Sequence, residues 1–180
     1  MTLFIPKNAS NILDKISKTA KEESLLDRGD LFLFFYYALL LEKKGLNIGH
    51  PFIKEIRHSL WELRPSNQRY FFTMLKGEIY LLHSFRKRTR NTPSREFKKA
   101  VLLLDELNPY KPDIWLPLED VLSSYLTEKE QRLIKKYTSF MIELVPEYNK
   151  ELLDFPRYFD KGHIDPPLLW VLSLIEKNSD

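Results

Sequence analysis

The residues best suited to chemistry in this sequence are cations gathered in its middle third. Residues 50–100 carry 12 Lys and Arg against 4 Asp and Glu, whereas residues 101–180 carry 9 against 15, within a formal net charge of only +3. Neutralisation of phosphates contributes most to nucleic-acid affinity, so a basic segment of this kind favours a partner with a phosphate backbone. The competing interpretation is a solvated charged rim, which is what most charge runs are.

The expected strand ends should bring these cations together. Arg64 ends one strand-like run, Arg69 begins the next, and His83 precedes a basic loop from Arg86 to Asn91. Neighbouring antiparallel strands place such ends along one edge of a sheet. An unperturbed histidine has a pKa near 6.5, so this residue type suits proton transfer, although a lone His in a strand, such as His83, is more often a structural hydrogen-bonding residue.

Other kinds of site find little support. The chain has no Cys, so a disulfide framework, a Cys-ligated zinc site and a Cys nucleophile are excluded. The remaining histidines, His50, His58 and His163, are scattered, and no Gly-rich phosphate loop or Ser nucleophile elbow occurs among only 5 glycines. We therefore expect neither a metal nor a cofactor.

The elements that must position the cations are recognised by the spacing of their apolar residues, which is helical in some segments and strand-like in others. Three- and four-residue apolar spacing predicts a helix from Asn8 or Ser10 to about Leu26 and a second, apolar nearly all round, over 30–44. Strand-like runs with short turns between them follow, and Thr92-Pro93 starts another helix that runs to about Leu107. The pattern predicts an α+β fold, with expected strands at 52–56, 59–64, 69–75 and 78–85.

The longest apolar run, Leu31 to Leu41, has 11 residues, whereas a bilayer span needs about 20. The segment Met1 to Ser10 has neither a cationic start nor a long apolar stretch. These features indicate a cytoplasmic protein without a membrane partner.

The middle segment resembles a known family. Its markers are Pro51 to Lys54, Trp61-Glu62-Leu63-Arg64, Arg69 followed by aromatics, Leu81-Leu82-His83-x-Phe85, a Lys/Arg-rich loop, and Thr92-Pro93-x-x-Glu96 with Ala100. This spaced series, between Gly49 and Leu107, resembles the HigB branch of the RelE toxin superfamily. The resemblance implies a RelE-like fold with two N-terminal helices, an antiparallel sheet of three to four strands and a following helix.

The same resemblance implies a function and a set of site residues. The function would be that of a toxin from a toxin–antitoxin system: a metal-independent endoribonuclease that cuts mRNA on translating ribosomes by attack of a ribose 2′-OH on the adjacent phosphate. Implied partners are mRNA, the ribosome and an antitoxin, for which a helix-turn-helix protein is one candidate. The residues carried over are Lys54, Arg64, Arg69 and His83 for catalysis, and Arg86, Lys87, Arg88 and Arg90 for gripping RNA.

The acidic carboxy-terminal segment is the part that the resemblance does not explain. The Asn108 to Pro112 break suggests a division into a toxin-like domain, 1–108, and a helical segment, 109–180, with expected helices at 118–126, 127–145 and 166–175. The segment could be an appendage packed on the core, an antitoxin-like shield for the RNA face, or a docking module.

A non-catalytic alternative also stands. The chain could be a RelE-fold binding protein, for example a phage-borne one, that binds RNA, a ribosome or an antitoxin. In that case its own acidic segment could shield the binding face.

Overall fold

One sheet organises the molecule. The computed structural model describes residues 1–7, 29–57, 59–65, 67–88, 92–107 and 114–144. The strands within these residues are β1 (Leu3–Pro6), β2 (Ile53–Arg57), β3 (Leu60–Leu63), β4 (Gln68–Leu75), β5 (Glu78–Arg86) and β6 (Trp115–Pro117). The helices are α2 (Gly29–Lys44), the 3₁₀ turn η2 (Gly45–Ile48), α3 (Ser94–Asp105), α4 (Leu118–Tyr125) and α5 (Glu128–Leu144). The expected α+β class is confirmed.

The predicted meander forms the centre of this sheet. The strand order is β2-β3-β4-β5-β1-β6, and β2 to β5 pair antiparallel in chain order. The β4–β5 hairpin closes through Lys76 and Gly77, both with positive φ, which is the geometry of a two-residue turn that matches strand twist. β2 lies at the sheet edge, as its sequence predicts.

The sheet is larger than expected, because two short strands extend it beyond β5. β1 pairs parallel to β5, and β6 pairs antiparallel to β1. Side chains also tie β1 into place: Glu42 of α2 accepts from the Leu3 backbone N–H at 2.7 Å, and Glu78 of β5 accepts from that of Thr2 at 2.6 Å.

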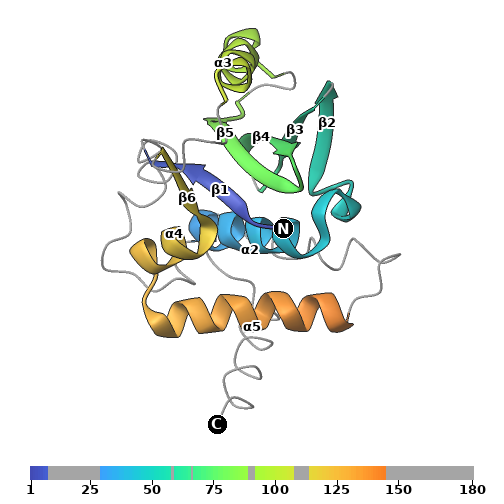
Figure 1. Ribbon diagram of the computed structural model, residues 1–180. Helices are drawn as coiled ribbons and strands as arrows, with labels where there is room; N and C mark the ends of the chain where they lie inside the picture. The colour runs from blue at the N-terminus through green and yellow to red at the C-terminus, as the bar shows by residue number, and fades with distance from the viewer. Residues whose placement is uncertain (8–28, 58, 66, 89–91, 108–113, 145–180) are drawn as a thin grey trace.

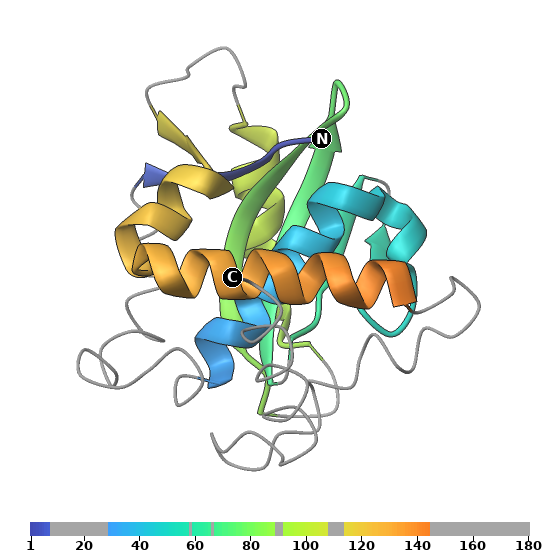
Figure 2. The same ribbon diagram turned by 90° about the horizontal axis from the view of Figure 1, so that it is seen from below.

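The elements form layers in the order α3, sheet, α2, α5 (Figure 1). The apolar run of α2 is buried throughout, from Leu31 to Leu41, because the sheet covers one side and α5 the other. Viewed from below, α5 crosses in front of α2 and the sheet (Figure 2). α4 packs with the same core through Leu118, Val121 and Leu122.

Among the described helices, α3 is the one that packs on the opposite sheet face, over a smaller core. Leu60, Phe71, Leu82 and Phe85 pack there against Ala100, with Phe97, Val101 and Leu104 half-buried beside them. Their three- and four-residue spacing places these α3 positions on one side of the helix. The cations discussed below lie on this same face.

The described helices of the acidic segment lie on the α2 side of the molecule. α4 and α5 share the large core with α2 and β1, whereas β6 contributes Leu116 to that core and Trp115 to the smaller core beneath α3. The predicted boundary at residue 108 remains a prediction. The helices expected at 8–26 and 166–175 lie outside the described residues.

Candidate functional site

Strand register aligns several predicted site residues in one row. Lys54 of β2 lies opposite Glu62 of β3, Glu62 opposite Phe71 of β4, and Phe71 opposite His83 of β5. Directly paired residues point to the same face of a sheet, and Phe71 belongs to the core beneath α3. Lys54, Glu62 and His83 therefore stand on the α3 face. Arg69 joins them there, because two-residue alternation puts it on the side of Phe71.

A buried carboxylate lies between the two predicted arginines. Glu62 is 2% exposed and Arg69 is 4% exposed. Arg64 Nε lies 3.7 Å from Glu62 Oε2, and Arg69 Nε lies 3.8 Å from Glu62 Oε1. Arg69 also donates from Nη1 to the carbonyl of Gln68 at 2.8 Å. Among the described residues, neither Glu62 Oε1 nor Arg64 Nε has a hydrogen-bond partner, so the pairs are ionic contacts at longer range.

Lys87 completes this group. Its backbone N–H donates to the carbonyl of Asn67 at 2.8 Å, which continues the β4–β5 ladder beyond the strand ends. The pKa of Lys87 is lowered, first by desolvation and then by the nearby charge of Arg69, with further lowering from Arg64 and Lys54 and an opposing effect of Glu62. Four cations thus lie near Glu62, two of them in ion pairs with it, and we call Lys54, Arg64, Arg69 and Lys87 the cation cluster.

The cation cluster brings like charges close together. Burial lowers the pKa of Lys87 most, and the nearby positive charges of Arg69, Arg64 and Lys54 lower it further. An anion bound among them would relieve that repulsion. A phosphate group is suited to the position, because guanidinium groups bind its oxygens through several N–H donors at once.

His83 is on the same sheet face but is bound to α3. Its Nε2 lies 2.7 Å from Glu96 Oε2, and the exposed Arg95 donates to Glu96 Oε1 from Nε at 3.2 Å and Nη2 at 3.0 Å. The hydrogen bond with His83 is the main cause that lowers the pKa of Glu96, and burial opposes it. The His83 ring is also stacked beside Phe85. This arrangement fastens the first turn of α3 to β5.

The predicted RNA-gripping residues are separated by the structure. Lys87 joins the cation cluster, whereas Arg86 pairs in register with Gln68 and so alternates to the other side of the sheet. Arg88 is exposed. Arg90 lies outside the described residues.

Two carboxylates of the site are missed by sequence reasoning. The alternation of the strand predicts which face of the sheet Glu62 occupies but assigns it no role in the site. Glu96 is noted in the sequence only as one of the residues of the family resemblance. A signal for Glu96 is present: it lies four residues before the inward-facing Ala100, on the same side of α3. For Glu62, the signal is its position two residues after Leu60, which is fully buried, because strand alternation points both side chains to the same face.

Two kinds of feature are absent from the described residues. No cluster of three or more potential His, Cys, Asp or Glu ligands occurs there that could hold a metal ion. In that same part of the chain, no helix has the length and apolar character needed to cross a membrane.

Residues 26–105 match the family of phage-derived Gp49-like proteins. The match spans α2, the strands β2 to β5 and α3, so it includes the whole cation cluster and the His83–Glu96 pair. The chain is similar to this family over that region. No curated protein matches the chain.

Proposed function

We propose that this protein is the toxin of a toxin–antitoxin system and acts as an endoribonuclease on mRNA in the cytoplasm, on translating ribosomes. Two findings support the proposal: the similarity to phage-derived Gp49-like proteins, which are related to RelE- and HigB-like toxins, and the cation cluster. The observation that carries it is the placing of Arg64, Arg69, Lys87 and Lys54 around the buried Glu62.

The proposed chemistry begins with attack of a ribose 2′-oxygen on the adjacent phosphorus. The bond to the 5′-oxygen then breaks, and a 2′,3′-cyclic phosphate forms. The transition state carries more negative charge on the phosphoryl oxygens than the ground state, so the prearranged Arg64 and Arg69 would stabilise it selectively. No metal ion is required for this step.

Lys87 and Lys54 are the groups we propose for proton transfer. The 2′-hydroxyl must lose a proton and the 5′-oxygen must gain one. A lysine with a lowered pKa releases its proton more readily than an ordinary lysine, which favours Lys87 as the donor to the leaving oxygen. Lys54, in its neutral form, is then the group that accepts the proton from the 2′-hydroxyl. His83 is held by Glu96, so we assign it the placement of α3 and not the proton transfer predicted from sequence.

The proposal is tested by induced expression with mapping of mRNA ends. Arg64→Ala should lower the rate of cleavage by about 100-fold or more, because it removes a guanidinium group that would stabilise the negative charge of the transition state. Arg132→Ala is the matched control, since Arg132 is an exposed residue of α5 on the other side of the molecule. Circular dichroism of each purified variant separates loss of activity from loss of fold.

Three outcomes discriminate among the functions. Growth arrest with cleavage that is lost only in Arg64→Ala supports the nuclease, and relief of that arrest by a coexpressed neighbouring gene product supports an antitoxin partner. Cleavage that survives in a folded Arg64→Ala variant contradicts the proposal. RNA binding without any cleavage would favour the non-catalytic RelE-fold binding protein. Assays with and without ribosomes decide whether the ribosome is required.

A further inference from the structure

The outer face of α3 has a charge order that does not suit an isolated helix. Lys98, Lys99, Leu102, Asp105 and Glu106 recur at three- and four-residue spacing and lie on the side away from the sheet. All five are exposed, and Leu102 is 61% exposed. The acidic residues stand at the carboxyl end, where the helix dipole favours cations, and no basic residue occupies the last turn.

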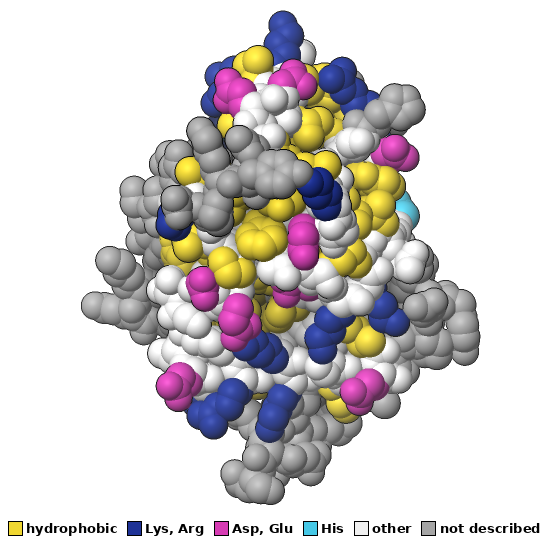
Figure 3. Space-filling view, viewed as in Figure 1, with side chains coloured by type: hydrophobic (Ala, Val, Ile, Leu, Met, Phe, Trp, Pro, Cys, Tyr) yellow, Lys and Arg dark blue, Asp and Glu magenta, His cyan; other side chains and the backbone are white. Residues whose placement is uncertain are grey.

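These charges lack partners of their own within the described structure. None of Lys98, Lys99, Asp105 and Glu106 forms an ion pair there. The positions four residues before the two carboxylates are Val101 and Leu102, which are apolar, so the usual intrahelical pairing is not available. α3 is the outermost layer of the fold, and Figure 3 shows basic, acidic and apolar side chains together over it.

The pattern is self-complementary about Leu102. If a second copy of α3 lies antiparallel on the first, a two-fold axis passes beside the two Leu102 side chains. The Lys98–Lys99 pair of each copy then faces the Asp105–Glu106 pair of the other, and each helix end receives charges that suit its dipole. A parallel arrangement would set like charges against each other.

We infer that α3 is a docking surface for a second copy of this chain, packed antiparallel about Leu102. The association is weak, because two helices of 12 residues bury less than the roughly 1,200 Å² of standard stable interfaces. It is also sensitive to salt, since its specificity comes from exposed charges. The inference is independent of the proposed nuclease activity.

Sedimentation of the full chain tests this surface. Between roughly 10 μM and 1 mM protein, the average mass should rise towards that of a dimer at low salt. Raising the salt from about 0.05 M to about 0.5 M should weaken the association by about 10-fold. A chain that remains monomeric at the highest concentration overturns the inference.

Charge reversal gives the sharper test. The doubly substituted chains Lys98→Glu/Lys99→Glu and Asp105→Lys/Glu106→Lys should each be monomeric, because each makes the outer face carry one sign of charge. An equimolar mixture of the two should form a heterodimer. Dimers that persist in either variant alone, or a mixture that fails to associate while the wild type does, overturn the inference.

A second pair of variants guards against effects on folding. Leu102→Asp places two carboxylates at the proposed axis and should abolish dimerisation. Leu75→Asp is the matched control, since Leu75 is an exposed leucine at the end of β4. Equal loss of dimerisation in Leu102→Asp and Leu75→Asp, both with wild-type circular dichroism, would also contradict docking through α3.

Discussion

Glu62 is the residue whose removal should affect the fold most strongly within the site. It stands between Arg64 and Arg69, and removing one member of a buried ion pair leaves the other charge uncompensated. We expect Glu62→Gln to lower the free energy of unfolding by about 3 kcal/mol, measured by urea denaturation. Glu55→Gln on the exposed part of β2 is the control and should change it by less than about 0.5 kcal/mol.

A small effect of Glu62→Gln, equal to that of Glu55→Gln, would mean that the guanidinium groups do not depend on the carboxylate. The cation cluster would then have to be stabilised in another way.

The His83–Glu96 pair predicts a pH dependence of stability. The pKa of Glu96 is held below its ordinary value of 4.5 by the hydrogen bond with His83, so the pair stabilises the fold fully above about pH 4.5. That contribution should be lost as the pH falls through the lowered pKa, because the folded state must then bind a proton that it resists.

The measurement is the free energy of unfolding as a function of pH. Glu96→Gln should lose less stability than the wild type on acidification below about pH 4.5, whereas the exposed Glu106→Gln should follow the wild type. Parallel curves for the wild type and Glu96→Gln would contradict this assignment.

At this scale, the cations were more predictable from sequence than their partners. Arg64 and Arg69 could be placed along one edge of the sheet because strand ends follow from local pattern, and Lys54 was added by the family resemblance. The bond between His83 and Glu96 could not, because it depends on how α3 lies across β5 after a loop. A charged residue in a strand also suggests a solvent face, and only the presence of cores on both sides of the sheet buries Glu62.

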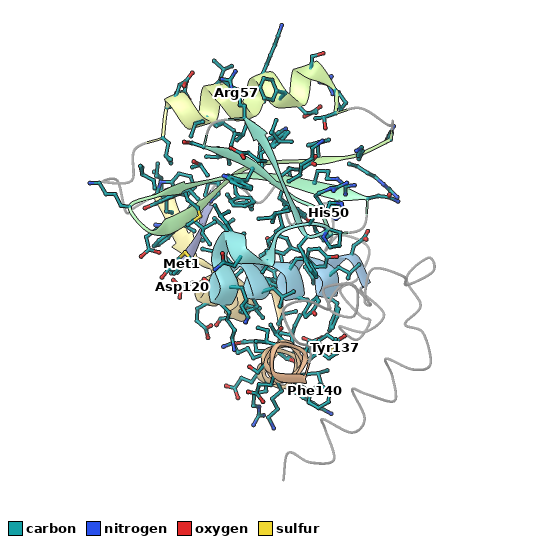
Figure 4. All side chains as sticks on the ribbon, turned by 90° about the vertical axis from the view of Figure 1, so that its right-hand side faces the viewer. Met1, His50, Arg57, Asp120, Tyr137 and Phe140 are labelled. Atoms are coloured by element: carbon teal, nitrogen blue, oxygen red, sulfur yellow. The ribbon has the colours of Figure 1, made fainter. Side chains whose placement is uncertain are left out.

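Among the elements, α5 is fixed to the core by Tyr137. This side chain is 0% exposed, and Figure 4 labels it on α5. Its ring contacts those of Phe32 and Tyr36 in α2 at centroid distances of 5.4 and 5.2 Å. We expect Tyr137→Ala to lower the free energy of unfolding by about 3 kcal/mol, since it leaves a cavity between the helices.

The conservative variant Tyr137→Phe provides the control. The buried Tyr137 hydroxyl has no hydrogen-bond partner among the described residues, so its removal should be neutral or slightly stabilising. A large loss of stability in Tyr137→Phe would reveal a bond that this structure does not contain.

Elements with their own apolar pattern or flanking turn residues were predictable, whereas the pairing of β1 and β6 was not. The sequence predicted α2, the β4–β5 hairpin and both carboxy-terminal helices within the described residues, because each has its own apolar pattern. β1 and β6 have four and three residues. Their pairing is decided by distant partners, and such short runs carry too little periodicity to predict a parallel strand beside β5.

For the whole molecule, the acidic segment is expected to be necessary for folding. Leu118, Val121, Leu122, Ile134 and Tyr137 are buried in the core that they share with α2 and β1. A chain that ends at Leu107 would expose this surface, so it should lack the cooperative thermal transition of the full chain, as followed by circular dichroism.

A chain that ends at Leu144 keeps all of those side chains and is the matched comparison. If the chain ending at Leu107 melted as cooperatively as the full protein, residues 109–180 would be a separable appendage. The predicted domain boundary would then be supported.

The burial of α2 also has a consequence for synthesis of the chain. Phe32 and Tyr137 touch in the folded protein, although they are about 100 residues apart in the sequence. A ribosome that makes this protein therefore releases α2 long before α5, the helix that covers the side of α2 facing away from the sheet. The segments from β2 to α3, which carry the cation cluster, emerge while α2 is still partly uncovered. The large core that supports them is complete only when α5 has left the exit tunnel.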